Sequence, residues 1–219
     1  MFTFSLARIP VRVHISFLFM AAVLGSNNGN PATLVLWLAI VFVSVLLHEL
    51  GHALVGRAFG LAPAIELHGF GGTTSWAHKQ VSSGKKMLIS LAGPMVGIVL
   101  GQAVALIFLR DDGGLELSRL GVTAVRYIYW VNFWWGLFNL LPILPLDGGN
   151  VLAEGLNVLT NGHGVRPARY ISIVLAVPAA LVSLWTGNLW IALLAGMFAY
   201  QNVRAVIGSR PRPAPPRAW

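Results

Sequence analysis

Two histidines and a glutamate lie close together in the segment His48-Glu49-Leu50-Gly51-His52. On an α-helix, residues four positions apart lie about 40° apart on one face, so both imidazoles can bind one metal ion. Glu49 lies about 100° from His48 and can reach a water molecule at that metal. This is the H-E-x-x-H arrangement of zinc peptidases. The alternative is a helix with two unrelated histidines and a buried glutamate that is paired elsewhere.

A catalytic zinc site uses three protein ligands, so two histidines leave one ligand to be found. Asp147 follows a segment that contains Pro142 and Pro145 and precedes two glycines. It lies at the end of an apolar segment, at a depth similar to that of the histidines, which makes it the natural third ligand. The alternative is a turn residue, because Asp-Gly is a common turn pair. The other acidic residues outside the histidine motif are Glu66, Asp111, Asp112, Glu116 and Glu154.

The elements that must position these residues are long apolar segments. Of the 219 residues, 56% are hydrophobic and only 10% are charged, whereas soluble domains carry about 25% charged residues. A helix needs about 20 residues to cross a bilayer. The sequence therefore predicts a mainly α polytopic membrane protein with about six transmembrane helices, in one intramembrane domain over residues 1–208. The expected spans are residues 13–25, 32–59, 87–109, 127–146, 170–185 and 189–203.

The basic residues indicate how these spans are oriented. With six spans, twelve of the 15 Lys and Arg residues fall on one side of the membrane and three on the other. The positive-inside rule then places both termini in the cytoplasm. The Pro- and Arg-rich tail over residues 209–219 is expected to be extended and cytoplasmic. An alternative for residues 13–24 is a cleaved signal peptide, which would leave five spans.

Charge and cysteine content exclude several classes of function. The formal net charge is +8, but the basic residues lie between apolar segments, which favours membrane topology, so no nucleic-acid partner is expected. The chain has no cysteine, which excludes disulfides, thiolate metal ligands and a cysteine nucleophile.

Two segments are predicted to form a small membrane-associated β element. Residues 64–76 contain β-branched and aromatic residues around glycines and can form an edge strand that pairs with an extended substrate. Such pairing would matter because a transmembrane substrate must unwind, and its freed backbone groups need partners. Phe2, Phe4 and Leu6 alternate with small or polar residues, which predicts a second short strand. The alternative for residues 69–72 is a flexible surface loop.

Taken together, these segments resemble the site-2 protease family of intramembrane zinc metalloproteases. The resemblance follows the order of the chain: an N-terminal segment at residues 9–17, the zinc-binding helix at 48–52, a Gly-rich strand region at 68–72, Ala92-Gly93-Pro94, and an Asn-Pro-Pro-Asp-Gly pattern over 139–148. The joint match is specific, although the single Gly and Pro matches are not. One departure follows Pro94, where the family often has an asparagine and this chain reads Met95-Val96-Gly97.

The resemblance implies roles for particular residues. It implies that His48, His52 and Asp147 bind one zinc ion per chain and that Glu49 is the catalytic base. It also implies that Asn139 lies on the substrate side of the site. The amide of Asn139 would orient the substrate or stabilise the oxyanion, and the alternative is a helix–helix hydrogen bond. The expected strand role further makes Gly71 and Gly72 candidate substrate-binding residues.

The implied activity is hydrolysis of peptide bonds in membrane-anchored substrates near the cytoplasmic side of the bilayer. The expected substrate is a transmembrane protein or a remnant signal peptide, and the expected location is the plasma membrane of a prokaryotic cell. The oligomeric state stays open. The main alternative is a zinc or cation transporter without enzymatic activity, and another is an inactive membrane adaptor. A transporter needs no glutamate at position 49, so the change Glu49→Gln separates it from a protease.

Overall fold

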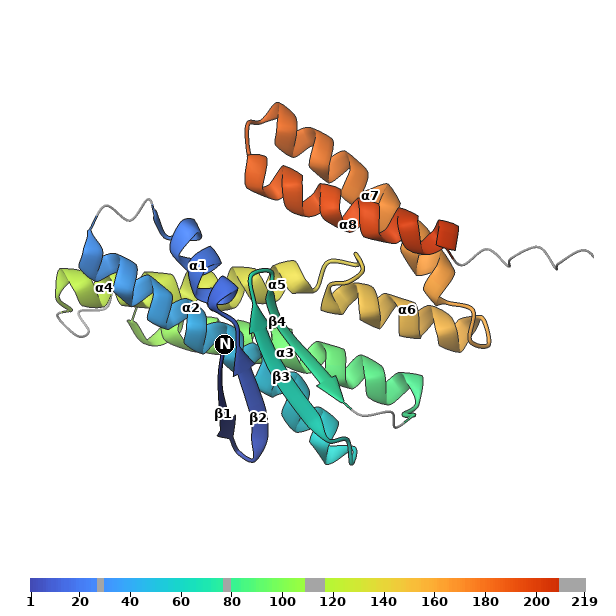
Figure 1. Cartoon of the computed structure of the whole chain (residues 1–219), viewed down its shortest axis with the longest axis horizontal. Coiled ribbons are helices and arrows are strands. Elements are labelled where there is room, and N and C mark those ends of the chain that lie inside the picture. The colour runs from blue at the N-terminus through green and yellow to red at the C-terminus, as the bar shows by residue number, and fades with distance from the viewer. Residues whose placement is uncertain (27–29, 77–79, 109–116, 209–219) are drawn as a thin grey trace, which may run out of the picture. The chain divides into compact units, whose positions relative to one another are not determined.

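The computed structural model describes residues 1–26, 30–76, 80–108 and 117–208 (Figure 1). The chain forms two compact units, Met1–Leu140 and Leu141–Trp219. The first unit contains β1 (Phe2–Leu6), β2 (Ile9–Val13), α1 (Ile15–Leu24), α2 (Pro31–Ala58), β3 (Pro63–His68), β4 (Gly71–Trp76), α3 (Ser83–Phe108), α4 (Arg119–Tyr129), the π-helical turn η2 (Trp130–Trp134) and α5 (Trp135–Asn139). The second contains α6 (Asp147–Leu159), α7 (Val165–Trp185) and α8 (Leu189–Gly208). The single intramembrane domain expected over residues 1–208 stays a prediction, and residues 209–219 lie outside the described part.

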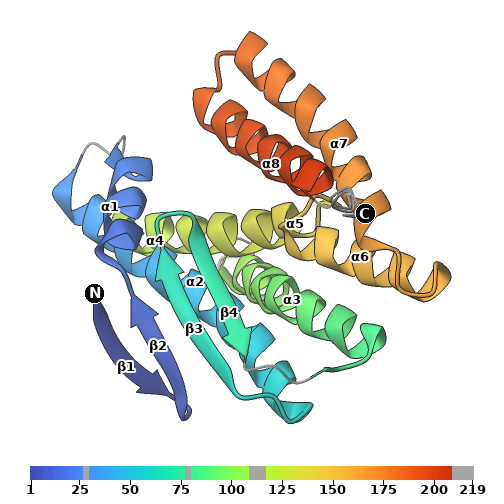
Figure 2. The ribbon, with the colours of Figure 1, turned by 45° about the vertical axis from the view of Figure 1, so that its right-hand side comes forward.

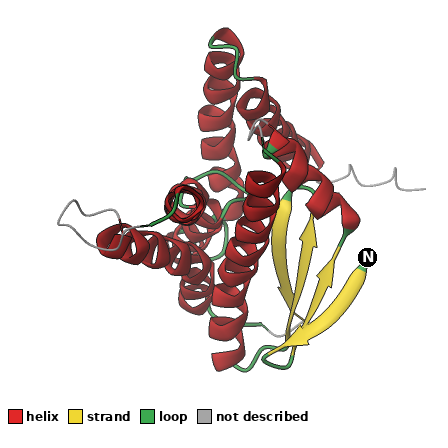
Figure 3. Ribbon diagram, turned by 90° about the vertical axis from the view of Figure 1, so that its left-hand side faces the viewer, coloured by secondary structure: helices red, strands yellow, loops and turns green. Residues whose placement is uncertain are grey.

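A four-stranded sheet packs against α2 in the first unit (Figure 3). Its order is β1-β2-β3-β4, with antiparallel pairs at both ends and a parallel pair between β2 and β3. Alternate side chains of the two central strands, from Ile9 to Val13 and from Ile65 to Leu67, are almost fully buried against α2. This period of two is what one buried sheet face requires.

The sequence expectation of strands is confirmed, with one difference. Residues 2–6 form β1, as their alternation predicts. The segment 64–76 forms two strands, β3 and β4, joined by the tight turn at Gly69-Phe70, and not one continuous strand or a loop. Gly71 closes the turn with φ of +120°, a backbone conformation that glycine adopts without steric cost. Within the described residues, the strand β4 has a sheet neighbour on one side only.

Four helices of the described chain are long and apolar enough to cross a membrane: α2, α3, α7 and α8. The helix α2 begins at Pro31, and Oδ1 of Asn30 caps it by accepting a hydrogen bond from the main-chain nitrogen of Ala32 at 2.8 Å. Six spans are not confirmed. The helix α1 has ten residues, fewer than the roughly 20 that a straight span requires, because Val13 and the residues before it belong to the sheet.

The fourth expected span, residues 127–146, has different bounds in the structure. Helical backbone begins at Arg119, continues through η2 and ends at Asn139. Pro142 and Pro145 follow within a few residues, and proline has no N–H to continue a helical hydrogen-bond ladder. Residues 140–146 therefore form an irregular loop, and α6 begins at Asp147.

The second unit is built around the α7–α8 hairpin. These helices lie side by side (Figure 2) and are joined at Gly187, where φ is +77°, a backbone conformation that glycine adopts without steric cost. The helix α6 packs on α7 through a small buried cluster of Leu144, Ala153 and Ala168.

Candidate metal centre

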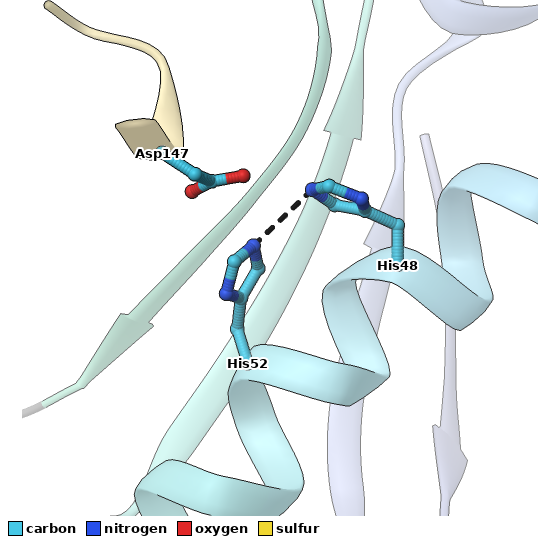
Figure 4. A group of neighbouring side chains, drawn as sticks. All are labelled: His48, His52 and Asp147. Carbon is cyan, nitrogen blue, oxygen red and sulfur yellow. Dashed lines mark hydrogen bonds between the residues drawn. The ribbon is translucent and has the colours of Figure 1, made fainter. Parts of the chain in front are cut away.

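His48 and His52 project from consecutive turns of α2 and face one another (Figure 4). Both are buried, and their Nε2 atoms lie 3.2 Å apart. Two Zn–N bonds of about 2.0–2.1 Å at a tetrahedral angle would separate the two nitrogens by about 3.3 Å. The spacing of the two imidazoles therefore fits a single zinc ion.

The tautomer of His52 is determined by a neighbouring helix. Its Nδ1 lies 2.7 Å from the carbonyl oxygen of Ile89 in α3. A carbonyl oxygen can only accept a hydrogen bond, so Nδ1 carries the proton and donates it. In the neutral ring, the lone pair then lies on Nε2, the atom that faces His48. A backbone carbonyl in this position also fixes the ring orientation of a metal ligand.

Two glycines allow α2 and α3 to approach closely at this level. A Cβ atom on Gly51 would lie 2.7 Å from the carbonyl oxygen of Ala92, and a Cβ atom on Gly93 would overlap the imidazole of His52. The glycine of the Ala92-Gly93-Pro94 motif therefore leaves the space that the His52 ring occupies. The sequence alone attaches no role to this glycine, because its partner lies about forty residues earlier in the chain.

Glu49 is buried and lies against β4. The hydroxyl of Thr74 donates a hydrogen bond to Oε2 of Glu49 at 2.7 Å. A Cβ atom on Gly72 would overlap the side chain of Glu49, so the absence of a side chain there allows the strand to approach the carboxylate. Sequence reasoning missed Thr74. The signal that could have found it is the period of two along β4, which places residues 72 and 74 on one face.

Asp147 is the first residue of α6, in the second unit, and is partly buried. A Cβ atom on Gly149 would overlap the main chain of Ile143 and Leu144, so this glycine allows the preceding loop to pack on the first turn of α6. Among the described residues, His48, His52 and Asp147 form a group of side chains that could hold a metal ion (Figure 4). Two imidazoles and one carboxylate are ligand types of catalytic zinc, so the donor set fits this metal.

The other acidic candidates are engaged elsewhere or lie outside the described residues. Glu66 forms an exposed ion pair with Arg12 at 2.8 Å. Glu154 accepts a hydrogen bond from Asn157 one turn later in α6. The acidic residues Asp111, Asp112 and Glu116 fall in the segment 109–116, which is outside the described part of the chain.

The expected substrate-side residues lie in the first unit. Asn139 ends α5, and its Nδ2 donates to the carbonyl of Trp135 at 2.9 Å, within its own helix. Gly71 begins β4, and a Cβ atom there would meet nothing within 4 Å. The roles of Asn139, Gly71 and Gly72 toward a substrate stay predictions.

Comparison with known proteins supports this description. The model of peptidase family M50 matches residues 115–185. A zinc metalloprotease of Methanocaldococcus jannaschii is 29% identical over 205 residues, which are 90% of this chain and 57% of that protein. The stage IV sporulation protein FB of Bacillus subtilis is 31% identical over 145 residues, which are 65% of this chain and 46% of that protein. The chain thus spans about half the length of the curated relatives it matches.

A solved structure, the site-2 protease from Methanocaldococcus jannaschii, matches over 98% of each chain with a TM-score of 0.63 and 24% identity. This likeness supports the fold, with its apolar helices and small sheet. The family model, the related sequences and the shared fold agree with the donor set described above, and the chain is similar to peptidase family M50, the site-2 protease family.

Proposed function

We propose that this protein is a zinc metalloendopeptidase that hydrolyses peptide bonds of membrane-anchored substrates. The observation that carries the proposal is the arrangement on α2. Two imidazoles converge with 3.2 Å between their Nε2 atoms, and the intervening Glu49 carboxylate is buried and accepts a hydrogen bond from Thr74. A binding or transport site for a cation would not require this glutamate between the two ligands.

In the proposed mechanism, His48, His52 and Asp147 hold the zinc ion. When bound, zinc polarises the scissile carbonyl and makes water a stronger nucleophile near neutral pH. Glu49 accepts the proton of the attacking water and returns it to the leaving amine. The hydrogen bond from Thr74 engages Oε2, which orients the carboxylate plane of Glu49.

Extended substrate would add to the open edge of β4. A transmembrane helix hides its peptide bonds in its own hydrogen bonds, so it must unwind before cleavage, and its freed backbone groups need partners. An edge strand supplies such partners, and β4 has a free edge in the described sheet. The same strand carries Gly72 and Thr74, which lie against Glu49. In this proposal Gly71 and Gly72 lie along the substrate, and the Asn139 amide orients it.

The substrate class is a transmembrane protein or a remnant signal peptide. The described part of the chain has four apolar helices long enough to span a membrane, and the chain has relatives in archaea and bacteria. Both observations support a multi-pass protein of a prokaryotic membrane. We place both termini and the cleavage reaction near the cytoplasmic side.

The test compares four forms of the purified full chain: wild type, His48→Ala, Asp147→Ala and Glu49→Gln. Zinc content is measured together with cleavage of a membrane-anchored reporter peptide in proteoliposomes. We expect about one zinc per chain in the wild type and in Glu49→Gln, and much less after loss of His48 or Asp147. Cleavage by Glu49→Gln should fall by orders of magnitude, because an amide cannot accept the proton.

Two outcomes would contradict the proposal. Wild-type zinc retention in Asp147→Ala would remove Asp147 as the third ligand. Equal cleavage by the wild type and Glu49→Gln would exclude Glu49 as the base and, with it, the mechanism.

A further inference from the structure

The irregular loop before Asp147 depends on two polar side chains of the α7–α8 hairpin. Leu144 lies in this loop, three residues before Asp147. Its main-chain nitrogen donates to Oγ of Ser172 in α7 at 2.9 Å, and its carbonyl oxygen accepts from Nδ2 of Asn202 in α8 at 2.7 Å. Each helix of the hairpin thus binds one backbone group of the same loop residue.

These two side chains are among the most deeply buried polar groups of the described chain. Ser172 is 0% exposed and Asn202 is 1% exposed. A backbone N–H or C=O in an apolar environment is costly when it has no partner. The loop is not helical, so the N–H and C=O groups of Leu144 have no partners in a helical hydrogen-bond pattern. The side chains of Ser172 and Asn202 provide these partners.

The geometry of Asn202 allows only one orientation of its amide. Its Nδ2 donates both to Leu144 and to the carbonyl of Phe198 at 2.8 Å, while its Oδ1 is buried without a hydrogen-bond partner among the described residues. Rotating the amide by half a turn would place Oδ1 against two carbonyl oxygens. Asn202 is therefore oriented for donation to Leu144, although a buried acceptor remains unpaired.

Close packing connects Leu144 to Asp147. The nitrogen of Leu146 donates to the carbonyl of Ile143 at 2.8 Å, which closes a tight turn. Gly149 lies so close to the main chain of Ile143 and Leu144 that a Cβ atom would not fit. Because the loop is packed against the first turn of α6, a shift at Leu144 must also move the main chain of Asp147.

We propose that Ser172 and Asn202 are positioning residues for Asp147, so that the α7–α8 hairpin orients this proposed zinc ligand. This inference rests on the proposed role of Asp147 as a zinc ligand. Neither residue contacts the metal. They hold the main chain of Leu144 and thereby orient the carboxylate of Asp147.

The experiment uses the full chain with Asn202→Leu or Ser172→Ala. The matched controls are Gln201→Leu, the exposed neighbour on α8, and Ser183→Ala, another buried serine of α7. Zinc affinity is measured by competition with a chelator, and the ligand geometry by the absorption spectrum of the cobalt-substituted protein. We expect zinc affinity to fall about 10- to 100-fold in the two test variants, as for other residues that orient metal ligands, with an altered cobalt spectrum. The controls should match the wild type.

The outcomes separate positioning from general stabilisation. If both test variants lose thermal stability but keep wild-type zinc affinity and cobalt spectrum, the inference is wrong. If Asn202→Leu fails to fold, Ser172→Ala decides by the same criterion, because it removes a single oxygen atom. The Asp147→Ala variant is measured in parallel. If it binds zinc with wild-type affinity, the proposed ligand set is wrong. If it binds zinc weakly while the Ser172 and Asn202 variants bind zinc with wild-type affinity, only this inference is wrong.

Discussion

At the scale of single residues, the carboxylate of Glu49 is oriented by a strand that is distant in sequence. Thr74 donates to Oε2 at 2.7 Å, and Gly72 leaves room for the side chain. Both residues lie on the face of β4 that packs toward α2, whereas Thr73 is exposed between them. The strand proposed to bind substrate therefore also orients the proposed base.

The first prediction concerns the Thr74 hydroxyl. Thr74→Val keeps the shape of the side chain but leaves Oε2 of Glu49 without this donor. A hydrogen bond to a charged group is worth about 1.5–3 kcal/mol, so we expect kcat to fall by at least about tenfold, with KM and zinc content little changed. Thr74→Ser should restore most of the activity, and Thr73→Val serves as the control on the exposed face. An unchanged kcat in Thr74→Val would show that the hydroxyl does not position the base.

At the scale of elements, the π-helical turn η2 brings Asn132 to α2. Its Nδ2 donates to Oγ of Ser44 at 2.8 Å and to the carbonyl of Ile128 at 2.8 Å. Ser44 lies one helical turn before His48, so this bond joins the segment after α4 to α2, the helix that carries both histidines. The turn η2 also lies close to α3. A Cβ atom on Gly97 of α3 would lie 2.8 Å from the carbonyl oxygen of Asn132.

A double-mutant cycle measures this connection. We expect Ser44→Ala and Asn132→Ala each to lower the free energy of unfolding in detergent, and the double variant to lose less than the sum. The coupling should be about 0.6–1.7 kcal/mol, the range found for interhelical hydrogen bonds in membrane proteins. Strictly additive losses would mean that the two side chains do not stabilise each other.

At the scale of the whole molecule, the proposed orientation in the membrane rests on charge and on the six expected spans. The side of the predicted topology that holds twelve of the 15 Lys and Arg residues also holds the β1–β2 hairpin, while the turn between α7 and α8 has no basic residue. With six spans, the positive-inside rule predicts that the hairpin lies in the cytoplasm and the turn lies outside.

The absence of cysteine makes this orientation directly testable, because a single introduced cysteine is the only thiol. Ser5→Cys in β1 and Thr186→Cys in the α7–α8 turn are both at exposed positions. With a membrane-impermeant maleimide on intact spheroplasts, we expect labelling of Thr186→Cys but not of Ser5→Cys, and labelling of both after lysis. Labelling of Ser5→Cys in intact spheroplasts would reverse the assigned topology.

Much of the metal centre could be predicted from the sequence because its pattern is local. His48, Glu49 and His52 lie within two turns of one helix, so helical periodicity alone brings the two imidazoles together. The apolar segments and the alternating residues of β1 are equally local signals. The bounds of the fourth expected span were wrong, although the prolines that end it were visible in the sequence.

The sequence by itself determined the chemistry of this protein: which residue types can hold zinc, which carboxylate lies beside them, and which segments are apolar enough for a membrane. Only the tertiary structure decided how these groups are held. Gly93 makes room for His52, Thr74 donates to Glu49, and Ser172 and Asn202 bind Leu144. Each of these contacts joins segments that are far apart in the chain, where neither helical nor strand periodicity relates one residue to the other, so they exist only once the helices and the sheet have packed.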